Sequence, residues 1–309
     1  MSEKKGDTPR VLRLRNMQYS DITFCLLTLN RTPWVKRSLL SIRDYCPTKH
    51  SIKILSQGQP SPQLIEFVTD LDENIELITS PVNLGCGGGR QLLSERVTSP
   101  FTMMLDDDMY LTDGAIVHAL NAFQENKSIG AVSMPQYDLD GRIVSLGGTH
   151  MIIEDGVIRF QRPRLNFQDD LIEVEYVDAG AMLYRTEMRE SFSWDPEMLD
   201  FEDEDKSLQI LRDGKWKQAI VPKGRLIHDR SWLGRNPTYE RKRLDGLAWR
   251  RAYRSFRAKW RLRLDLRSHL LYEVVYPTLT LTRCQRLMTA LNRFIQMRKM
   301  NAICELSSS

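Results

Sequence analysis

Short apolar runs alternate with longer amphipathic stretches along the first half of the chain. Ile22–Leu29 is continuous, apolar and rich in β-branched and aromatic residues, which is typical of a strand buried on both faces. Thr32 and Pro33 then predict the N-cap and the first position of a helix. The apolar positions of this helix recur at helical spacing and would share one face: Val35, Leu39 and Ile42.

The same strand–helix unit recurs downstream. Further strands are expected at residues 52–55, 75–78, 101–105, 131–134, 174–177 and 216–221. Helices are expected at residues 61–68, 88–96 and 203–211, with another beginning near 112–113. Strands that alternate with helices predict an α/β fold with a mostly parallel sheet and right-handed crossovers. Gly141, Gly147 and Gly148 interrupt this order and indicate a hairpin or a small mixed sheet.

The pattern divides the chain into three regions. Residues 1–20 form a polar N-terminal extension, residues 21–236 the α/β domain, and residues 237–309 a basic, mainly helical C-terminal region. The boundary is placed near Asn236-Pro237, because the chain becomes basic and helical in pattern beyond about Ser231. No internal repeat or low-complexity tract is present.

Composition narrows the class of protein without selecting a function. Of 309 residues, 41% are hydrophobic and 27% charged, as in ordinary globular proteins. No apolar run reaches the length of about eighteen residues that a spanning helix needs, and the polar opening is unlike a secretory signal. The five cysteines include no Cys-x-x-Cys pair, so we expect a cytoplasmic protein without disulfides or structural zinc.

Positive charge is concentrated in the C-terminal region, although the net charge is only +4. Between Arg241 and Arg267 eleven basic residues are opposed by two aspartates. Four aromatic residues fall among them at helical spacing: Trp249, Tyr253, Phe256 and Trp260. Three interpretations stay open: a helix that packs its aromatic face on the α/β domain, peripheral contact with an anionic membrane surface on the cytoplasmic side, or nucleic-acid binding. The last is not expected, because no known nucleic-acid module accompanies the basic helix.

Three adjacent carboxylates follow the strand expected at 101–105: Asp106, Asp107 and Asp108. Carboxylates this close repel one another unless a cation neutralises them, and their oxygens suit Mg²⁺ or Mn²⁺. In an open parallel sheet, ligands bind beyond the carboxyl ends of the strands, where Thr28–Arg31 and Ser56–Gly58 also fall. The alternative interpretation is a solvated acidic turn in which Asp113 caps the next helix.

Three further segments carry polar chemistry. Asn83–Arg90 is rich in glycine and opens a helix, which lets the backbone approach an anion, although a tight structural turn explains it equally well. Glu202–Asp205 begins a helix and could supply a general base or simply stabilise the helix N-terminus. His228 follows a strand and is either a structural residue or a metal ligand beside a carboxylate.

This ordered set resembles the family 2 inverting glycosyltransferases of the GT-A fold, from about Asp21 to Asp229. The resemblance implies a nucleotide-sugar donor, with a UDP-sugar expected, and Mn²⁺ or Mg²⁺ as cofactor. The residues that it places on the nucleotide side are Thr28, Asn30, Arg31, Gln57, Asn83, Gly85, Arg90, Asp106 and Asp107. Asp107 is there the spacer between Asp106, which faces the nucleotide, and Asp108, which faces the metal.

The resemblance also assigns the remaining chemistry. Asp108 and His228 would hold the metal, and Asp203 in the Glu-Asp-x-Asp segment would be the general base. Residues 177–182 resemble the family's strand-to-helix segment beside the donor sugar and acceptor. The residues expected on that acceptor and donor-sugar side are Gly180, Ala181, Glu202 and Asp205.

Two departures from the family pattern refine the expectation. Gln57 stands where the family usually has an acidic residue for the nucleotide base. No Gln-x-x-Arg-Trp motif follows the acidic cluster, which favours transfer of a single sugar over processive synthesis. The acceptor could be a lipid-linked saccharide, a small metabolite or a peptide.

Two other functions remain as alternatives. A sugar nucleotidyltransferase shares the doubly wound sheet, but it needs a glycine-rich, lysine-containing signature near the first strand, and Leu29–Thr32 has none. A catalytically silent binding protein could keep the fold, but the intact Asp106, Asp108, Asp203 and His228 argue against loss of activity.

Overall fold

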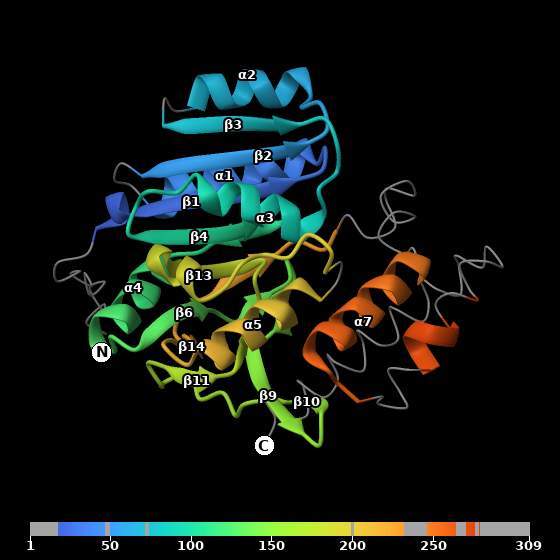
Figure 1. Ribbon diagram of the computed structural model, residues 1–309. Coiled ribbons are helices and arrows are strands. Elements are labelled where there is room, and N and C mark those ends of the chain that lie inside the picture. Colours follow the sequence, from blue (N-terminus) through green and yellow to red (C-terminus); the bar gives the residue numbers. More distant parts are fainter. Residues whose placement is uncertain are drawn as a thin grey trace, which may run out of the picture.

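A computed structural model describes residues 18–46, 50–71, 74–198, 201–231, 246–263, 270–275 and 278. Its centre is an eight-stranded sheet with the strand order β11-β14-β6-β13-β4-β1-β2-β3 (Figure 1). The strands of this sheet are β1 (Ile22–Thr28), β2 (Ser51–Gln57), β3 (Ile75–Ser80), β4 (Phe101–Asp106), β6 (Ile129–Ser133), β11 (Ile172–Val174), β13 (Ala181–Arg185) and β14 (Lys217–Ile220).

The sheet is mostly parallel, as the alternation of strands and helices predicts. β1 pairs in parallel with both β2 and β4, and β2 pairs in parallel with β3. β13 runs antiparallel between β4 and β6, and β11 runs antiparallel to β14. Because β13 is reversed, its first residue lies beside the last residues of β4, with Ala181 opposite Leu105. The β13 start therefore joins the edge where the parallel strands end.

Helices cover both faces of the sheet. The helical segments are η1 (Tyr19–Asp21), α1 (Thr32–Tyr45), α2 (Pro62–Leu71), α3 (Gly85–Glu95), α4 (Ala115–Glu125), η2 (Thr186–Glu190), α5 (Glu202–Asp213), α7 (Gly246–Trp260) and η3 (Leu270–Val275). One apolar core unites the sheet with α1, α2 and α4, and a second unites it with α3 and α5 (Figure 1). The predicted inner face of α1 is confirmed, because Val35, Leu39 and Ile42 are fully buried.

The irregular middle of the chain forms two small sheets. One has the order β5-β15-β7-β8 and the other β10-β9-β12. Their strands are β5 (Met109–Leu111), β7 (Gln136–Tyr137), β8 (Ile143–Ser145), β9 (Gly148–Glu154), β10 (Val157–Gln161), β12 (Tyr176–Val177) and β15 (Leu226–His228). The hairpin expected around Gly141 is β7–β8, whose antiparallel strands join across a turn that contains Gly141. A second hairpin, β9–β10, turns at Gly156. β15 pairs with β5, so the strand that ends at His228 lies beside the strand that follows the aspartates.

The glycine-rich segment is helical over more of its length than the pattern predicts. α3 begins at Gly85, not at Gly88. Glycine is needed there because of packing: a Cβ at Gly87 would lie 2.5 Å from the backbone oxygen of Asp195, and one at Gly89 would lie 2.5 Å from Leu27. The first two turns of α3 therefore lie close to the sheet and to the loop after η2.

Three other expectations need correction. The single strand predicted at 174–177 is divided between β11 and β12, because the Glu175 side chain accepts the Met151 N–H and its backbone carbonyl accepts Gln218 Nε2. Residues 177–182 connect a strand to a strand, not to a helix, since Ala181–Arg185 enters the central sheet as β13. The α4 helix begins at Ala115 after Gly114, so Asp113 does not cap it.

Helix α7 is the described part of the basic C-terminal region that can be placed against the α/β domain. Its buried residues Ala252, Tyr253 and Phe256 pack with Met198 and Phe201 beside α5. The Phe256 and Phe201 rings stack at 5.1 Å between centroids. The aromatic-packing interpretation is therefore confirmed for α7 (Figure 1). The expected boundary near Asn236-Pro237 and most of the N-terminal extension lie outside the described residues.

Within the described residues, no helix combines the length and the apolar character that crossing a membrane requires.

Candidate functional site

The predicted nucleotide-side residues meet at one edge of the central sheet. Thr28 ends β1, Gln57 ends β2 and Asp106 ends β4. These three strands are parallel neighbours, so their carboxyl ends point to the same side. The order of strands thus assembles residues that are far apart in the sequence.

Arg31 binds two of the three adjacent aspartates. Its Nε and Nη2 donate to the Asp107 carboxylate, with Nε 3.1 Å from Oδ2, and Nη1 donates to Asp108 Oδ2 at 3.0 Å. The Thr28 hydroxyl also donates to Asp107 Oδ2, at 2.5 Å. Asp107 is fully buried and Asp108 is 3% exposed, so the triplet is not a solvated acidic turn. Asp107 joins the ends of β1 and β4.

Arg90 binds Asp106 together with two carboxylates of α5. Its Nη2 donates to Asp106 Oδ1 at 3.0 Å, and Nη1 donates to Glu202 Oε1 at 3.0 Å and Asp203 Oδ1 at 3.4 Å. The guanidinium also lies over the Trp194 ring, 5.4 Å from its centroid. A buried charge is stable only when it is paired and hydrogen-bonded, and Arg90 meets this condition with three carboxylates.

The turn between β12 and β13 brings Asp106 and Asp203 to the same place. The Asp106 N–H donates to the Gly180 carbonyl oxygen at 2.8 Å, and the Ala179 N–H donates to Asp203 Oδ2 at 3.1 Å. A Cβ at Gly180 would lie 2.6 Å from Asp106 Oδ2. Glycine at 180 is therefore required by the close approach of the Asp106 carboxylate. Ala181, the next residue, is buried at the start of β13.

Burial and the two arginines set the charge of the aspartates. Burial alone would raise the pKa of Asp106, but Arg90 and Arg31 outweigh it and hold the pKa below its usual value. Burial raises the pKa of Asp107 to about 7, with Arg31 opposing the rise and Asp108 adding to it. The two arginines thus hold Asp106 ionised, and its side chain is 35% exposed.

His228 lies beside Asp108, with 4.0 Å between Nε2 and Oδ2. Gln136 fixes the imidazole. Its Nε2 donates to an Asp178 carboxylate oxygen at 3.0 Å, so its carbonyl oxygen faces His228 Nδ1 at 3.1 Å. Nδ1 must then carry the proton, which leaves the lone pair of neutral His228 on Nε2, the nitrogen nearer Asp108.

This pair would supply two of the ligands of a divalent cation. Two ligand atoms 4.0 Å apart can both lie about 2.1 Å from one Mg²⁺-sized ion. Among the described residues no group of three or more His, Cys, Asp or Glu side chains could hold a metal by itself. Mg²⁺ sites that use one or two protein ligands take substrate phosphate oxygens for the rest. Arg31 would have to share or release Asp108 when such an ion binds.

The other predicted nucleotide-side residues lie at or after the ends of the neighbouring strands β1, β2 and β3. Gln57 is buried, accepts the Leu84 N–H at 2.5 Å and donates to the Gly85 carbonyl oxygen at 3.3 Å, so it ties β2 to the start of α3. The exposed Asn83 accepts the Gly85 N–H at 2.9 Å, and Asn30 has a positive φ of 56°. Gln57 ends β2, Asn83 lies in the connection between β3 and α3, and Asn30 follows β1.

Asp205 points away from the other acidic residues of α5. It is fully buried, accepts Trp260 Nε1–H at 2.7 Å and pairs with Lys259 Nζ at 2.9 Å, both on α7. Gln209 Nε2 donates to it at 2.8 Å as well. The structure therefore joins Asp205 to the docking of α7, whereas Glu202 and Asp203 remain with Arg90.

Sequence patterns did not point to Gln136, Trp194 or Lys206. Gln136 contacts His228, and Trp194 contacts Arg90. The residues of each pair are far apart in the sequence, so no local sequence pattern predicts these contacts. Lys206 lies one turn after Asp203 on α5 and is fully buried, which is rare for a lysine. The sequence feature that could have identified Lys206 is its position on the inward-facing side of an amphipathic helix.

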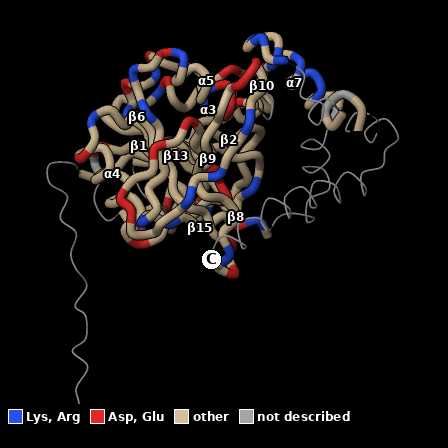
Figure 2. Tube along the Cα trace, turned by 90° about the horizontal axis from the view of Figure 1, so that it is seen from below, with Lys and Arg blue, Asp and Glu red and all other residues tan. Residues whose placement is uncertain are grey.

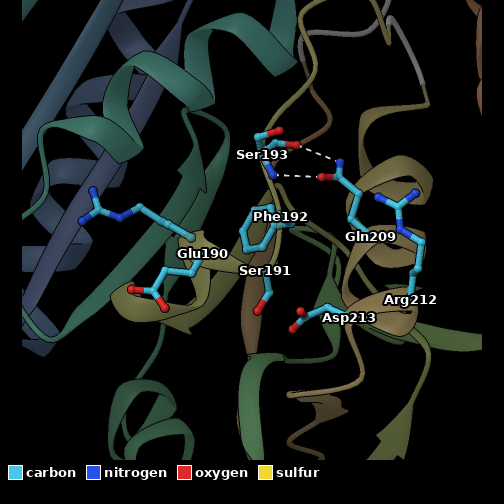
Figure 3. A pocket seen from close by; sticks show the side chains of 8 residues that line it. Glu190, Ser191, Phe192, Ser193, Gln209, Arg212 and Asp213 are labelled. Atoms are coloured by element: carbon cyan, nitrogen blue, oxygen red, sulfur yellow. Dashed lines mark hydrogen bonds between the residues drawn. The ribbon is translucent and has the colours of Figure 1, made fainter.

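A pocket of about 400 Å³ opens elsewhere, between the segment after η2 and the C-terminal half of α5 (Figure 3). Its wall includes Phe192, and a pair of hydrogen bonds between Ser193 and Gln209 crosses it. None of the predicted site residues lines this pocket. Its lining mixes both signs of charge, and it is separate from the edge where Asp106 lies.

Solved structures with the same fold include glycosyltransferases. GalNAc-T7 with UDP, GalNAc and Mn²⁺ has a TM-score of 0.56 and 13% identity over 84% of this chain and 58% of that chain. Residues 1–349 of S. aureus TarS in complex with UDP give 0.53 and 12% over 84% and 75%. The Pyrobaculum calidifontis mannosyltransferase PcManGT in complex with GDP-Man and Mn²⁺ gives 0.52 and 10% over 90% and 88%. At these identities the likeness establishes the fold, and the expected GT-A fold is confirmed.

This chain spans 58% of the GalNAc-T7 chain and 39% of a longer S. aureus TarS chain. No curated protein sequence matches it. The profile of a family described as glycosyl transferase family 2 matches residues 23–191, which is more than half of the 309 residues and contains the aspartate triplet, the glycine-rich helix start and the β12–β13 turn. On that match and the shared fold, the chain belongs to glycosyl transferase family 2.

Proposed function

We propose that this protein is an inverting, non-processive glycosyltransferase that moves one sugar from a nucleotide-sugar donor to an acceptor. The observation that carries the proposal is the convergence of Asp106 and Asp203 on Arg90, with Gly180 between them. These groups come from β4, α5, α3 and the β12–β13 turn. A donor-side carboxylate and a second, partly exposed carboxylate are thereby held next to one another.

Asp203 is proposed as the general base. Its side chain is 20% exposed, and the Ala179 N–H and Arg90 fix its two oxygens in place. In the reaction, an Asp203 oxygen takes the proton of the acceptor hydroxyl, and the acceptor oxygen forms a bond to the anomeric carbon. The bond from that carbon to the diphosphate breaks, and the nucleoside diphosphate leaves with the electron pair. Attack from the side opposite the leaving group inverts the anomeric carbon. General base catalysis typically contributes about 10²–10⁴-fold.

Asp108 and His228 are the residues that would hold Mn²⁺ or Mg²⁺. A divalent cation bound there would neutralise charge that develops on the leaving diphosphate. Gln136 keeps His228 in the tautomer that a metal ligand needs. Arg31 and Arg90 lie on the neighbouring carboxylates and add positive charge at the same edge. We propose that residues at the carboxyl ends of β1 and β2 and just before the start of α3 contact the nucleoside. Gln57 and Asn83 are among them.

The donor is proposed to be a UDP-sugar. Two of the similar solved structures contain UDP, and one contains GDP-Man, which keeps a guanine nucleotide as the alternative.

The acceptor is proposed to be a lipid-linked saccharide, a small metabolite or a peptide. A lipid-linked acceptor suits a cytoplasmic protein that contacts the membrane peripherally. The exposed Arg251 and Arg254 of α7 support this, and Figure 2 shows that Lys and Arg positions recur along this helix. Absence of salt-sensitive co-sedimentation with anionic vesicles would remove the membrane proposal.

Calorimetry with UDP, in the presence and absence of Mn²⁺, tests the metal and donor assignment. We expect wild-type protein to bind UDP at least about tenfold more tightly with Mn²⁺, and Asp108→Ala to lose that gain, because the variant lacks the carboxylate nearest His228. Asp113→Ala is the matched control, since Asp113 is an exposed aspartate just after β5. Equal Mn²⁺ dependence in Asp108→Ala and in wild type contradicts the assignment.

A further inference from the structure

A buried lysine lies under the β12–β13 turn. Lys206 is fully buried, and its Nζ donates to the Val177 carbonyl oxygen at 2.8 Å and contacts Met182 Sδ at 3.5 Å. Val177 lies just before the turn residues 178–180, and Met182 is the second residue after them. One ammonium group therefore touches both ends of the turn that contacts Asp106 and Asp203.

Lys206 lacks the ion pair that would normally accompany a buried ammonium. No carboxylate of the described residues lies within 4.0 Å of its Nζ. Burial lowers the pKa of Lys206 to about 8, although Asp203 and Asp178 act to raise it. A buried charge with one strong hydrogen bond destabilises a fold relative to an apolar residue of the same size. Fold stability therefore does not account for a lysine at this position.

The turn that Lys206 touches is hydrogen-bonded to three residues of the site. Its Ala179 N–H is bonded to Asp203, its Gly180 carbonyl oxygen accepts the Asp106 N–H, and Asp178 is bonded to Gln136, the partner of His228. Lys206 also lies on α5 one turn after Asp203. It thus links the helix that carries the proposed base to the turn that receives it.

We propose that Lys206 is a positioning residue for sugar transfer, which fixes the 178–180 turn against α5 and so sets the place of Asp203 relative to the donor site. The proposal rests on the function proposed above, in which Asp203 is the general base. Lys206 touches neither donor nor acceptor and acts through the turn.

The test compares Lys206→Met with wild type, with Ser207→Ala as matched control. Methionine fills a similar volume without the charge. Ser207 is the next residue on α5 and equally buried, and its hydroxyl has no hydrogen-bond partner among the residues that the structure describes. We expect Lys206→Met to lower kcat by about 10- to 100-fold, because misplacement by about 1 Å can cost 10²-fold. The Kd for UDP with Mn²⁺ and the thermal midpoint at pH 7 should be unchanged, or the midpoint raised. Turnover is followed as UDP released from a UDP-sugar that wild type uses.

Lys206→Gln separates the hydrogen bond from the charge. Glutamine can still donate toward the Val177 carbonyl oxygen, so we expect it to restore part of the kcat that methionine loses. This variant also keeps the test decisive if Lys206→Met fails to fold.

The pH dependence of the protein's thermal stability tests whether the Lys206 ammonium is buried in the folded state. The unfolded chain keeps the Lys206 proton up to about pH 10.5 and the folded chain only to about pH 8, so the stability of wild type rises with pH through that window. The gain of Lys206→Met in thermal midpoint should therefore be largest below pH 8 and shrink toward pH 10.5. The charged or titratable groups facing Lys206 are Asp203, Glu204, Asp178, Arg90 and Tyr176.

The outcomes separate this proposal from the proposed function. Asp203→Asn is assayed in parallel. If Asp203→Asn is inactive while Lys206→Met keeps the wild-type kcat, the positioning role is wrong and the proposed function stands. A fall in thermal midpoint and UDP affinity together with kcat would also contradict it, since that is the result of a structural lysine. Wild-type activity in Asp203→Asn would instead remove the proposed base.

Discussion

Some side chains in this protein affect a residue that they do not touch, because the residue between them can donate a hydrogen bond only on one side and accept only on the other. Asp178 can only accept, so the Gln136 amide must turn its nitrogen to Asp178 and its oxygen to His228. The proton of neutral His228 is thereby placed on Nδ1. The chain of contacts from Asp178 to Asp108 depends on residues separated by as many as 120 positions in the sequence, which explains why no local motif revealed Gln136.

Gln136→Leu should weaken Mn²⁺-dependent UDP binding by about 10- to 100-fold, because His228 loses the partner that fixes its tautomer and ring orientation. Ser145→Ala is the control: it removes another hydrogen bond to the same Asp178 oxygen but leaves the Gln136–His228 contact in place. Titration of UDP in Mn²⁺ measures both. Equal weakening in the two variants would assign the effect to Asp178 and not to His228.

At the scale of helices and strands, α5 is held from two sides. Glu202 and Asp203 in its first turn accept hydrogen bonds from Arg90. Asp205, two residues further along, binds Lys259 and Trp260 of α7. The sequence pattern identified α5 and the aromatic face of α7, because both follow helical periodicity. It did not separate the roles of the four acidic residues, since the partner of each is on another element.

Trp260→Phe should lower the free energy of unfolding by about 1–3 kcal/mol, because the buried Asp205 carboxylate loses the indole N–H and the ring keeps most of its apolar contact. Arg251→Ala, an exposed change on the same helix, should alter it by no more than about 0.5 kcal/mol. Urea unfolding provides the comparison. A Trp260→Phe value as small as that of Arg251→Ala would mean that α7 does not dock through Asp205.

For the whole molecule, the sequence predicted most of the parallel sheet and the edge that carries the site. Strands such as β1 and β4 are buried on both faces, so their composition alone reveals them. The division of 174–177 into two strands and the entry of Ala181–Arg185 into the central sheet depend on long-range pairing, which no local pattern encodes. The pairing of Arg90 with Asp106, Glu202 and Asp203 has the same origin, because the fold brings together residues as many as 113 positions apart.

Asp203 is proposed to take the acceptor proton in a donor site built around Asp106, Asp108 and His228. Asp203→Asn tests this role when both the turnover of a UDP-sugar and the affinity for UDP with Mn²⁺ are measured. We expect turnover to fall by at least about 10²-fold while UDP affinity stays within about twofold of wild type. Turnover equal to that of wild type, with UDP bound normally, would contradict it.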